Sequence, residues 1–250
     1  IADPFAALSA MPVATSAFRD MTGIRFEVPQ FVAERCTGCG QCWTQCPDTA
    51  IPGLVSEIDQ LLLTAASAAC DDGDACKQLP GIVLPLAEEM RRVLKEVPQI
   101  KFVDALDMAY CRVSGHLELE PAQRKALDEE LKAVAARLVD FRLAKTAPFF
   151  DVPERETEGS GGLLSITVNP FACKGCNLCV EVCPDNALLT VKQDESIVEQ
   201  LRDNWAFWQR LPDTPDRFVQ IRDLDEGIGI LHTMLLKKAN YHAMVGGDGA

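Results

Sequence analysis

Residues 36–47 read CTGCGQCWTQCP, and residues 173–184 read CKGCNLCVEVCP. Each stretch has the form C-x2-C-x2-C-x3-C-P, so the chain contains an internal repeat. The similarity continues past the proline, where residues 48–51 (DTAI) correspond to residues 185–188 (DNAL). The repeat predicts two related half-domains that pack as one unit.

This cysteine spacing is typical of [4Fe–4S] sites. One short loop supplies three thiolates, and the cysteine after the three-residue gap ligates the other cluster in two-cluster ferredoxins. The sequence therefore predicts two [4Fe–4S] clusters with crossed ligands and no catalytic residue. The first cluster is predicted to bind Cys36, Cys39, Cys42 and Cys183, and the second to bind Cys173, Cys176, Cys179 and Cys46.

Structural zinc is the competing explanation for paired cysteines. Two copies of a four-cysteine run, each closed by Cys-Pro, favour iron–sulfur clusters instead. Gly38 and Gly175 lie inside the loops, where the lack of a Cβ would let the backbone approach the inorganic sulfides, although simple turn glycines would look the same. Lys174 is either an electrostatic influence on its cluster or an ordinary solvated lysine.

Three of the eleven cysteines, Cys70, Cys76 and Cys111, lie outside the repeats. Their spacing matches no common metal site, and we interpret them as small buried residues. An odd total fits a disulfide framework poorly and indicates a reducing compartment, so the predicted localisation is cytoplasmic. The three histidines are isolated, and the three tryptophans are interpreted as packing residues rather than electron relays.

Composition excludes two kinds of partner. The formal net charge of −13 and a pI near 4.7 argue against nucleic acid, because binding to a phosphate backbone rests on Lys and Arg. No run approaches the ~20 apolar residues that cross a bilayer, so no membrane partner is expected.

The segment between the two motifs is far longer than a minimal ferredoxin needs and reads as helical. Apolar residues recur at helical spacing in four stretches, at 58–69, 82–97, 102–113 and 127–141. Four such helices can bury one another as a small bundle. Residues 153–162 lack apolar side chains and end in glycine and serine, which predicts a flexible return to the second motif.

We therefore predict an α+β fold, a bacterial 2[4Fe–4S] ferredoxin-like domain with a large helical insertion between its cysteine motifs. Residues 1–35 form an extended lead-in with a short strand at 24–29, and residues 36–56 form the first half of the domain. Residues 57–162 are the helical insertion and linker, and residues 163–195 are the second half, with a strand at 188–192. Residues 196–250 are a tail, helical in part of 224–244.

The similarity to known proteins extends beyond the cysteines. Residues 11–18 (MPVATSAF), 28–31 (VPQF) and 204–212 (NWAFWQRLP) are similar to segments that occur in the same order in the pyruvate:ferredoxin (2-oxoacid:acceptor) oxidoreductase family. The chain resembles the ferredoxin-like domain of that family over about residues 11–56 and 160–250, but not over most of the insertion. Residues 246–250 resemble the stretch that leads into the family's thiamine diphosphate domain, so we expect the chain to be a segment of a larger enzyme.

This resemblance implies intramolecular electron transfer within a 2-oxoacid:ferredoxin oxidoreductase. Such an enzyme decarboxylates pyruvate or a similar 2-oxoacid to an acyl-CoA and reduces ferredoxin or flavodoxin. It implies thiamine diphosphate, magnesium and a third [4Fe–4S] cluster in the parent enzyme, which is expected to be a homo-oligomer. The expected partners of this segment are the acceptor protein and the domains that bind thiamine diphosphate and coenzyme A, and the segment itself is expected to be a carrier without a catalytic site.

Two other functions stay open. The cluster motif alone would equally suit a free-standing ferredoxin or an electron-transfer subunit of another redox complex. An interaction module with purely structural clusters ranks last, because two clusters that share crossed ligands make a short electron path. The sequence leaves undecided the 2-oxoacid, the acceptor, the potentials, the oligomeric state and the role of the insertion, which either serves the clusters or their acceptor or is a decoration.

Overall fold

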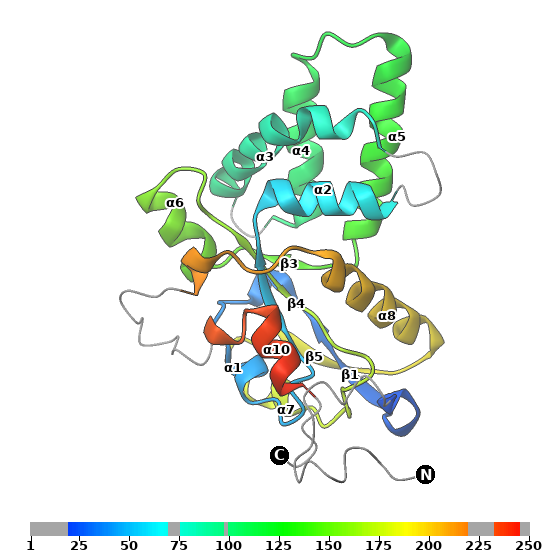
Figure 1. Ribbon diagram of the computed structural model, residues 1–250, viewed down its shortest axis with the longest axis vertical. Coiled ribbons are helices and arrows are strands. Elements are labelled where there is room, and N and C mark those ends of the chain that lie inside the picture. The colour runs from blue at the N-terminus through cyan, green and yellow to red at the C-terminus, as the bar shows by residue number, and fades with distance from the viewer. Residues whose placement is uncertain (1–19, 70–75, 98–99, 220–232, 246–250) are drawn as a thin grey trace.

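The computed structural model describes residues 20–69, 76–97, 100–219 and 233–245. Figure 1 shows a helical lobe built from the middle of the chain and, beneath it, a lobe of short strands and helices built from both ends. The two cysteine motifs lie in the lower lobe. The architecture is thus a mixed helix and sheet fold, as the sequence predicts.

Two small antiparallel sheets carry the internal repeat. Strand β1 (Glu27–Phe31) pairs with β5 (Leu188–Lys192), and β4 (Leu163–Ile166) pairs with β2 (Gly53–Ser56) and with the short β3 (Leu143–Ala144). Each sheet therefore joins the strand before one motif to the strand after the other motif. The two registers correspond: Gln30 faces Leu189 in one sheet, and Ser165 faces Leu54 in the other. The halves are consequently interlocked about a pseudo-twofold axis.

Each motif contains one turn of helix. These are α1 (Gln41–Thr44) in the first half and α7 (Leu178–Glu181) in the second, and the two pack against each other. Gly40 and Asn177, the residues just before them, both adopt left-handed backbone conformations. Glycine and asparagine are the residues that enter this region most readily, which explains their presence at the same position of each half.

The insertion contains the four helices that its apolar spacing predicts. They are α2 (Ile58–Ala69), α3 (Leu79–Glu96), α4 (Phe102–Ser114) and α5 (Pro121–Leu138). Helix α3 packs on α2 and α4, and α5 packs on α2. Their apolar faces bury residues such as Leu61, Leu86, Leu106 and Val134, in a cluster that continues into β2, β4 and α8. One core therefore extends from the four helices to the part of the chain that carries the cysteine motifs.

The predicted flexible linker at 153–162 is wrong. The π-helical turn η5 (Ala147–Asp151) and helix α6 (Val152–Glu156) lead into a compact corner, where Gly161 and Gly162 are buried. The carboxylate of Glu154 is buried there and accepts hydrogen bonds from the N–H groups of Gly159 and Gly161, and Lys95 of α3 lies 2.7 Å away. The prediction failed because it treated Glu154 as a solvated charge.

The extended lead-in is also wrong in part. Within its described residues, Met21–Ile24 form the 3-10 turn η3 and Ala33–Arg35 the 3-10 turn η4, and the strand begins at Glu27 rather than at residue 24. Residues 11–18, which contribute to the family resemblance, lie outside the described residues.

The tail after the second motif forms helix α8 (Glu195–Arg210), the 3-10 turn η6 (Asp216–Phe218) and helix α10 (Lys238–Met244). Trp205 and Trp208 of α8 stack with their ring centroids 4.9 Å apart, and both rings contact Tyr241 of α10. These tryptophans and Trp43 are buried. Their role as packing residues agrees with the sequence analysis. Helix α10 lies within the stretch 224–244 that was predicted to be helical in part, and residues 224–232 of that stretch lie outside the described residues.

No helix in the described part of the chain is long and apolar enough to span a bilayer.

Candidate metal centres

The structure brings the eight predicted ligands together in two groups of four. Cys36, Cys39, Cys42 and Cys183 line one cavity, which we call site 1. Cys173, Cys176, Cys179 and Cys46 line the other, which we call site 2. Each site thus takes three cysteines from one motif and the last cysteine of the other motif, which is the crossed grouping that the sequence predicts.

The loops around both sites have matching backbones. Gly38 and Gly175 have φ values of +80° and +70°, and Thr49 and Asn186, three residues after the last cysteine of each motif, have φ values of +47° and +50°. A Cβ on Gly175 would lie 2.5 Å from the carbonyl oxygen of Glu27. Glycine is therefore required at this position by both its backbone conformation and the close approach of β1.

Backbone N–H groups point at the cysteine sulfurs in the same way in each half. The N–H of Ala50 donates to Sγ of Cys46, and the N–H of Ala187 donates to Sγ of Cys183, both at 3.2 Å. Such hydrogen bonds stabilise the thiolate form of a cysteine and tune the potential of a cluster bound to it.

The electrostatics of the two sites favour a bound cation. Burial raises the pKa of Cys36 to about 12, and burial likewise raises the pKa of Cys46 to about 11 and that of Cys179 to about 12. The pKa of Cys42 is raised well above its usual value by burial and then by the neighbouring cysteines. Four neighbouring thiols, most of them buried or partly buried, cannot all ionise unless positive charge lies among them, and an iron–sulfur core would supply that charge.

The donor set of each site matches a [4Fe–4S] cluster. Four cysteines line each cavity, and four cysteine thiolates are the ligands that hold such a cluster. The residues present therefore fit [4Fe–4S]. In the described part of the chain, no group of three or more His, Cys, Asp or Glu side chains is arranged to hold a single metal ion.

A polar contact crosses between the halves at each site. At site 1, the Thr37 hydroxyl donates to the carboxylate of Asp185 at 2.8 Å. At site 2, the ammonium of Lys174 lies 2.8 Å from the carboxylate of Asp48. Lys174 is therefore an ion-pair partner that holds the two motifs together, which neither of the two interpretations of this lysine anticipated.

Sequence reasoning missed Arg25, which is 4% exposed. Its guanidinium donates to the carbonyl oxygens of Pro170 and Cys173, the latter at 2.9 Å, and to the side chain of Gln193. The only sequence signal was that Arg25 is a charged residue in the stretch 24–28, where apolar and charged residues alternate. That alternation does not reveal a contact with residues so far along the chain.

The other cysteines and histidines of the described residues line neither site, and Cys70 and His232 lie outside the described residues. Cys111 and His116 are exposed on or just after α4. Cys76 is disulfide-bonded, so its interpretation as a free buried thiol was wrong. His242 contacts the rings of Trp208 and Tyr241 and is a packing residue.

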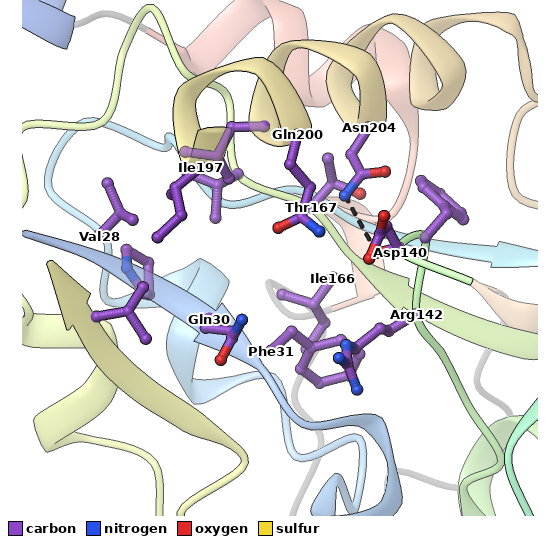
Figure 2. A pocket seen from close by; sticks show the side chains of 15 residues that line it. Val28, Gln30, Phe31, Asp140, Arg142, Ile166, Thr167, Ile197, Gln200 and Asn204 are labelled. Carbon is purple, nitrogen blue, oxygen red and sulfur yellow. Dashed lines mark hydrogen bonds between the residues drawn. The ribbon is translucent and has the colours of Figure 1, made fainter. Parts of the chain in front are cut away.

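A further pocket lies between β1 and α8 (Figure 2). Ile197, Gln200 and Asn204 reach into it from α8, above an apolar floor that includes Val28 and Ile166. Its charged residues, Asp140 and Arg142, are both exposed. The lining contains no pair of groups suited to acid–base or nucleophilic catalysis, so we assign no reaction to this pocket.

Comparison with known proteins agrees with the two sites. Residues 29–51 and 166–189 each match the 4Fe-4S binding domain. These two segments contain both cysteine motifs and the last residues of the strands that precede them. No curated protein and no solved structure is significantly similar to the chain. The fold and the sites together define an iron–sulfur protein with two 4Fe-4S binding motifs.

Proposed function

We propose that the chain binds one [4Fe–4S] cluster at site 1 and one at site 2 and carries electrons between them. The observation that supports this most strongly is the crossed grouping of the cysteines, because each cavity is closed by a residue more than a hundred positions away from its other three. Bound clusters supply one-electron redox chemistry. The protein supplies eight sulfur ligands, seven of them buried or partly buried, together with N–H donors to the sulfurs and a pair of interlocked half-domains.

The first experiment is anaerobic reconstitution with iron and sulfide, followed by iron and acid-labile sulfide analysis and by EPR during reduction. We expect about eight irons per chain and a spin-coupled signal from two reduced centres. About four irons, or a protein that retains zinc and gives no EPR signal, would contradict the proposal.

We propose further that this carrier is a segment of a 2-oxoacid:ferredoxin oxidoreductase. The support is the resemblance of residues 28–31 and 204–212 to that family. Both stretches belong to the described core: β1 includes 28–31, and the tryptophans of 204–212 pack on Tyr241, whose hydroxyl accepts a hydrogen bond from Asn169 near the second motif. Residues 28–31 thus adjoin site 2 through Pro29, and residues 204–212 connect to the second half through Tyr241.

In that function, the segment would receive electrons from the oxidative decarboxylation of pyruvate or a similar 2-oxoacid and pass them to ferredoxin or flavodoxin. Thiamine diphosphate, magnesium, a third [4Fe–4S] cluster and the coenzyme A site would lie in other domains of the parent enzyme, a cytoplasmic homo-oligomer. The segment itself would be an electron carrier.

The test is to express the complete gene product that contains this sequence and to measure ferredoxin reduction with a 2-oxoacid and coenzyme A. We expect reduction that requires both compounds and yields acyl-CoA. A complete product without 2-oxoacid-dependent activity that still exchanges electrons with a redox partner would instead support a free-standing ferredoxin or another complex's electron-transfer subunit.

A further inference from the structure

The pseudo-twofold relation between the two sites allows them to be compared position by position. Position 36 of the first half corresponds to 173 of the second, and the same offset relates the N–H donors to Cys46 and Cys183, the glycines at 38 and 175, and the registers of the two sheets. Local backbone structure therefore contributes about equally to both sites. Charges that break this equivalence decide which site holds an electron more tightly.

The first difference in charge between the two sites is at positions 37 and 174. Asp185 at site 1 is met by the neutral hydroxyl of Thr37, whereas the equivalent Asp48 at site 2 is met by the ammonium of Lys174, each at 2.8 Å. Among the described residues, the exposed carboxylate of Asp185 at site 1 is contacted across the halves by a neutral group, whereas the buried carboxylate of Asp48 at site 2 forms an ion pair.

The second difference in charge between the two sites is Arg25. Its guanidinium is buried and donates to the carbonyl oxygen of Cys173, a predicted ligand of site 2. Within the described residues it forms no ion pair with a carboxylate, and Asp20, the carboxylate that acts on it electrostatically, is nearly half exposed and lies 3.3 Å from Arg202. The equivalent position at site 1 is Gly162, which lies against Val55 and Phe218. Site 1 thus has no counterpart of this cation.

We propose that Arg25 and Lys174 make site 2 the higher-potential site, so that electrons flow from site 1 to site 2. This inference rests on the proposed binding of a cluster at each site. Reduction adds one negative charge to a site, and a nearby buried cation stabilises that charge more strongly than solvent-screened groups do. The step is a one-electron transfer in which site 1 is oxidised and site 2 is reduced; no bond forms or breaks and no proton moves.

The remaining charges near the sites lie at the surface. The carboxylate of Glu27 accepts a hydrogen bond from Asn177 beside site 2, and Arg35 donates to the carbonyl oxygen of Asn186 beside site 1. Glu27 is partly exposed and Arg35 is exposed, so water and salt weaken both effects. The charges of Glu27 and Arg35 would reduce the difference in potential between the two sites, but solvent screens them more than it screens Arg25.

Exposure of the ligands supports the same direction. Cys176 of site 2 is the exposed member of the eight predicted ligands, and each of the other seven is buried or partly buried. Electron transfer to an acceptor needs a short path to the surface. An electron that collects at site 2 would therefore lie at the edge from which it can leave.

The experiment is a reductive titration of the reconstituted chain followed by EPR, with charge variants of each half. Arg25→Gln is expected to shift the reduction equilibrium of the higher-potential centre at least tenfold toward the oxidised form. This corresponds to a fall in potential of about 59 mV for one electron. The potential of the other centre should stay unchanged. Arg25→Lys, which keeps the charge, should restore most of the potential. Thr37→Lys, which copies the second half's lysine into the first, should raise the lower-potential centre.

Lys174→Thr at the surface provides an independent test if Arg25→Gln lowers iron content, and it should lower the higher-potential centre alone. The proposal is overturned if the Arg25 and Lys174 variants shift the lower-potential centre or neither centre, or if Thr37→Lys shifts the higher one. Wild-type iron content separates the two ideas: about eight irons with unmoved potentials contradicts only the direction of flow, whereas fewer irons contradicts cluster binding itself.

Discussion

At the scale of single residues, Glu154 shows how a charged side chain can order a corner. Burial would raise the pKa of its carboxyl, but Lys95 and the N–H groups of Gly159 and Gly161 outweigh burial, and the pKa lies below its usual value. Glu154→Gln removes the charge that these three donors share, so we expect a loss of about 1–3 kcal/mol in the free energy of unfolding at neutral pH. Urea unfolding measures it.

The pH dependence of this loss has a definite sign. Because the folded state lowers the pKa, the contribution of Glu154 is fully present above the unfolded value near 4.5 and disappears as the pH falls through the folded value. The difference between wild type and Glu154→Gln should therefore shrink below about pH 4.5. Glu158→Gln is the matched control, since Glu158 lies 4.0 Å from the same lysine but is 88% exposed. An equal effect of both variants would argue against the buried network.

At the scale of elements, the start of helix α3 is capped by a side chain from another helix. Gln78, its N-cap residue, makes no capping hydrogen bond with its own side chain. The carboxylate of Glu130 on α5 instead accepts hydrogen bonds from the N–H groups of Lys77, Gln78 and Leu79, at distances from 2.8 to 3.2 Å. These donors would otherwise lack partners at the helix terminus, and the negative charge suits the helix dipole.

Glu130→Ala should therefore destabilise the insertion by about 1–2 kcal/mol, as removal of an N-cap does. Urea unfolding followed by far-UV circular dichroism measures this, and iron content should stay unchanged because the insertion supplies no predicted ligand. Glu129→Ala is the control: Glu129 is 66% exposed and reaches only Lys125, at 3.9 Å. Because alanine has a higher helix propensity than glutamate, neither variant should lose stability through propensity; if Glu129→Ala were as destabilising as Glu130→Ala, the loss would not come from capping.

At the scale of the whole molecule, the crossed grouping of the cysteines predicts that each centre depends on both motifs. Cys183→Ala changes the second motif but should empty site 1, which takes its other three ligands from the first motif. Iron content should fall from about eight to about four per chain, and Cys46→Ala should likewise empty site 2.

The surviving centre can be identified by its response to charge. In the Cys183→Ala background the remaining EPR signal should still shift in potential with Lys174→Thr, because Lys174 adjoins site 2. If Thr37→Lys moved it instead, the surviving centre would be site 1 and the ligands would not be crossed.

Local patterns predicted much of this molecule. Cysteine spacing predicted which eight cysteines line the two cavities and how they are grouped, because three cysteines of each site lie within seven residues of one another. Apolar periodicity located helices α2 to α5, since a core-facing helix needs a continuous stripe such as the one from Ile58 to Ala69. The strand at 188–192 was likewise readable from local residues.

What the sequence alone determined is therefore the chemistry of the two sites and the class of each long element, because short-range spacing and periodicity encode both. Only the tertiary structure decided which charges stand beside each site. Lys174 forms an ion pair with Asp48, and Arg25 donates a hydrogen bond to the carbonyl oxygen of Cys173. The carboxylate of Glu154 is buried and accepts hydrogen bonds from backbone N–H groups, instead of lying in solvent in a linker. Contacts such as the first two join residues more than a hundred positions apart, and no local pattern encodes them; they exist because the half-domains exchange strands and ligands when the chain folds.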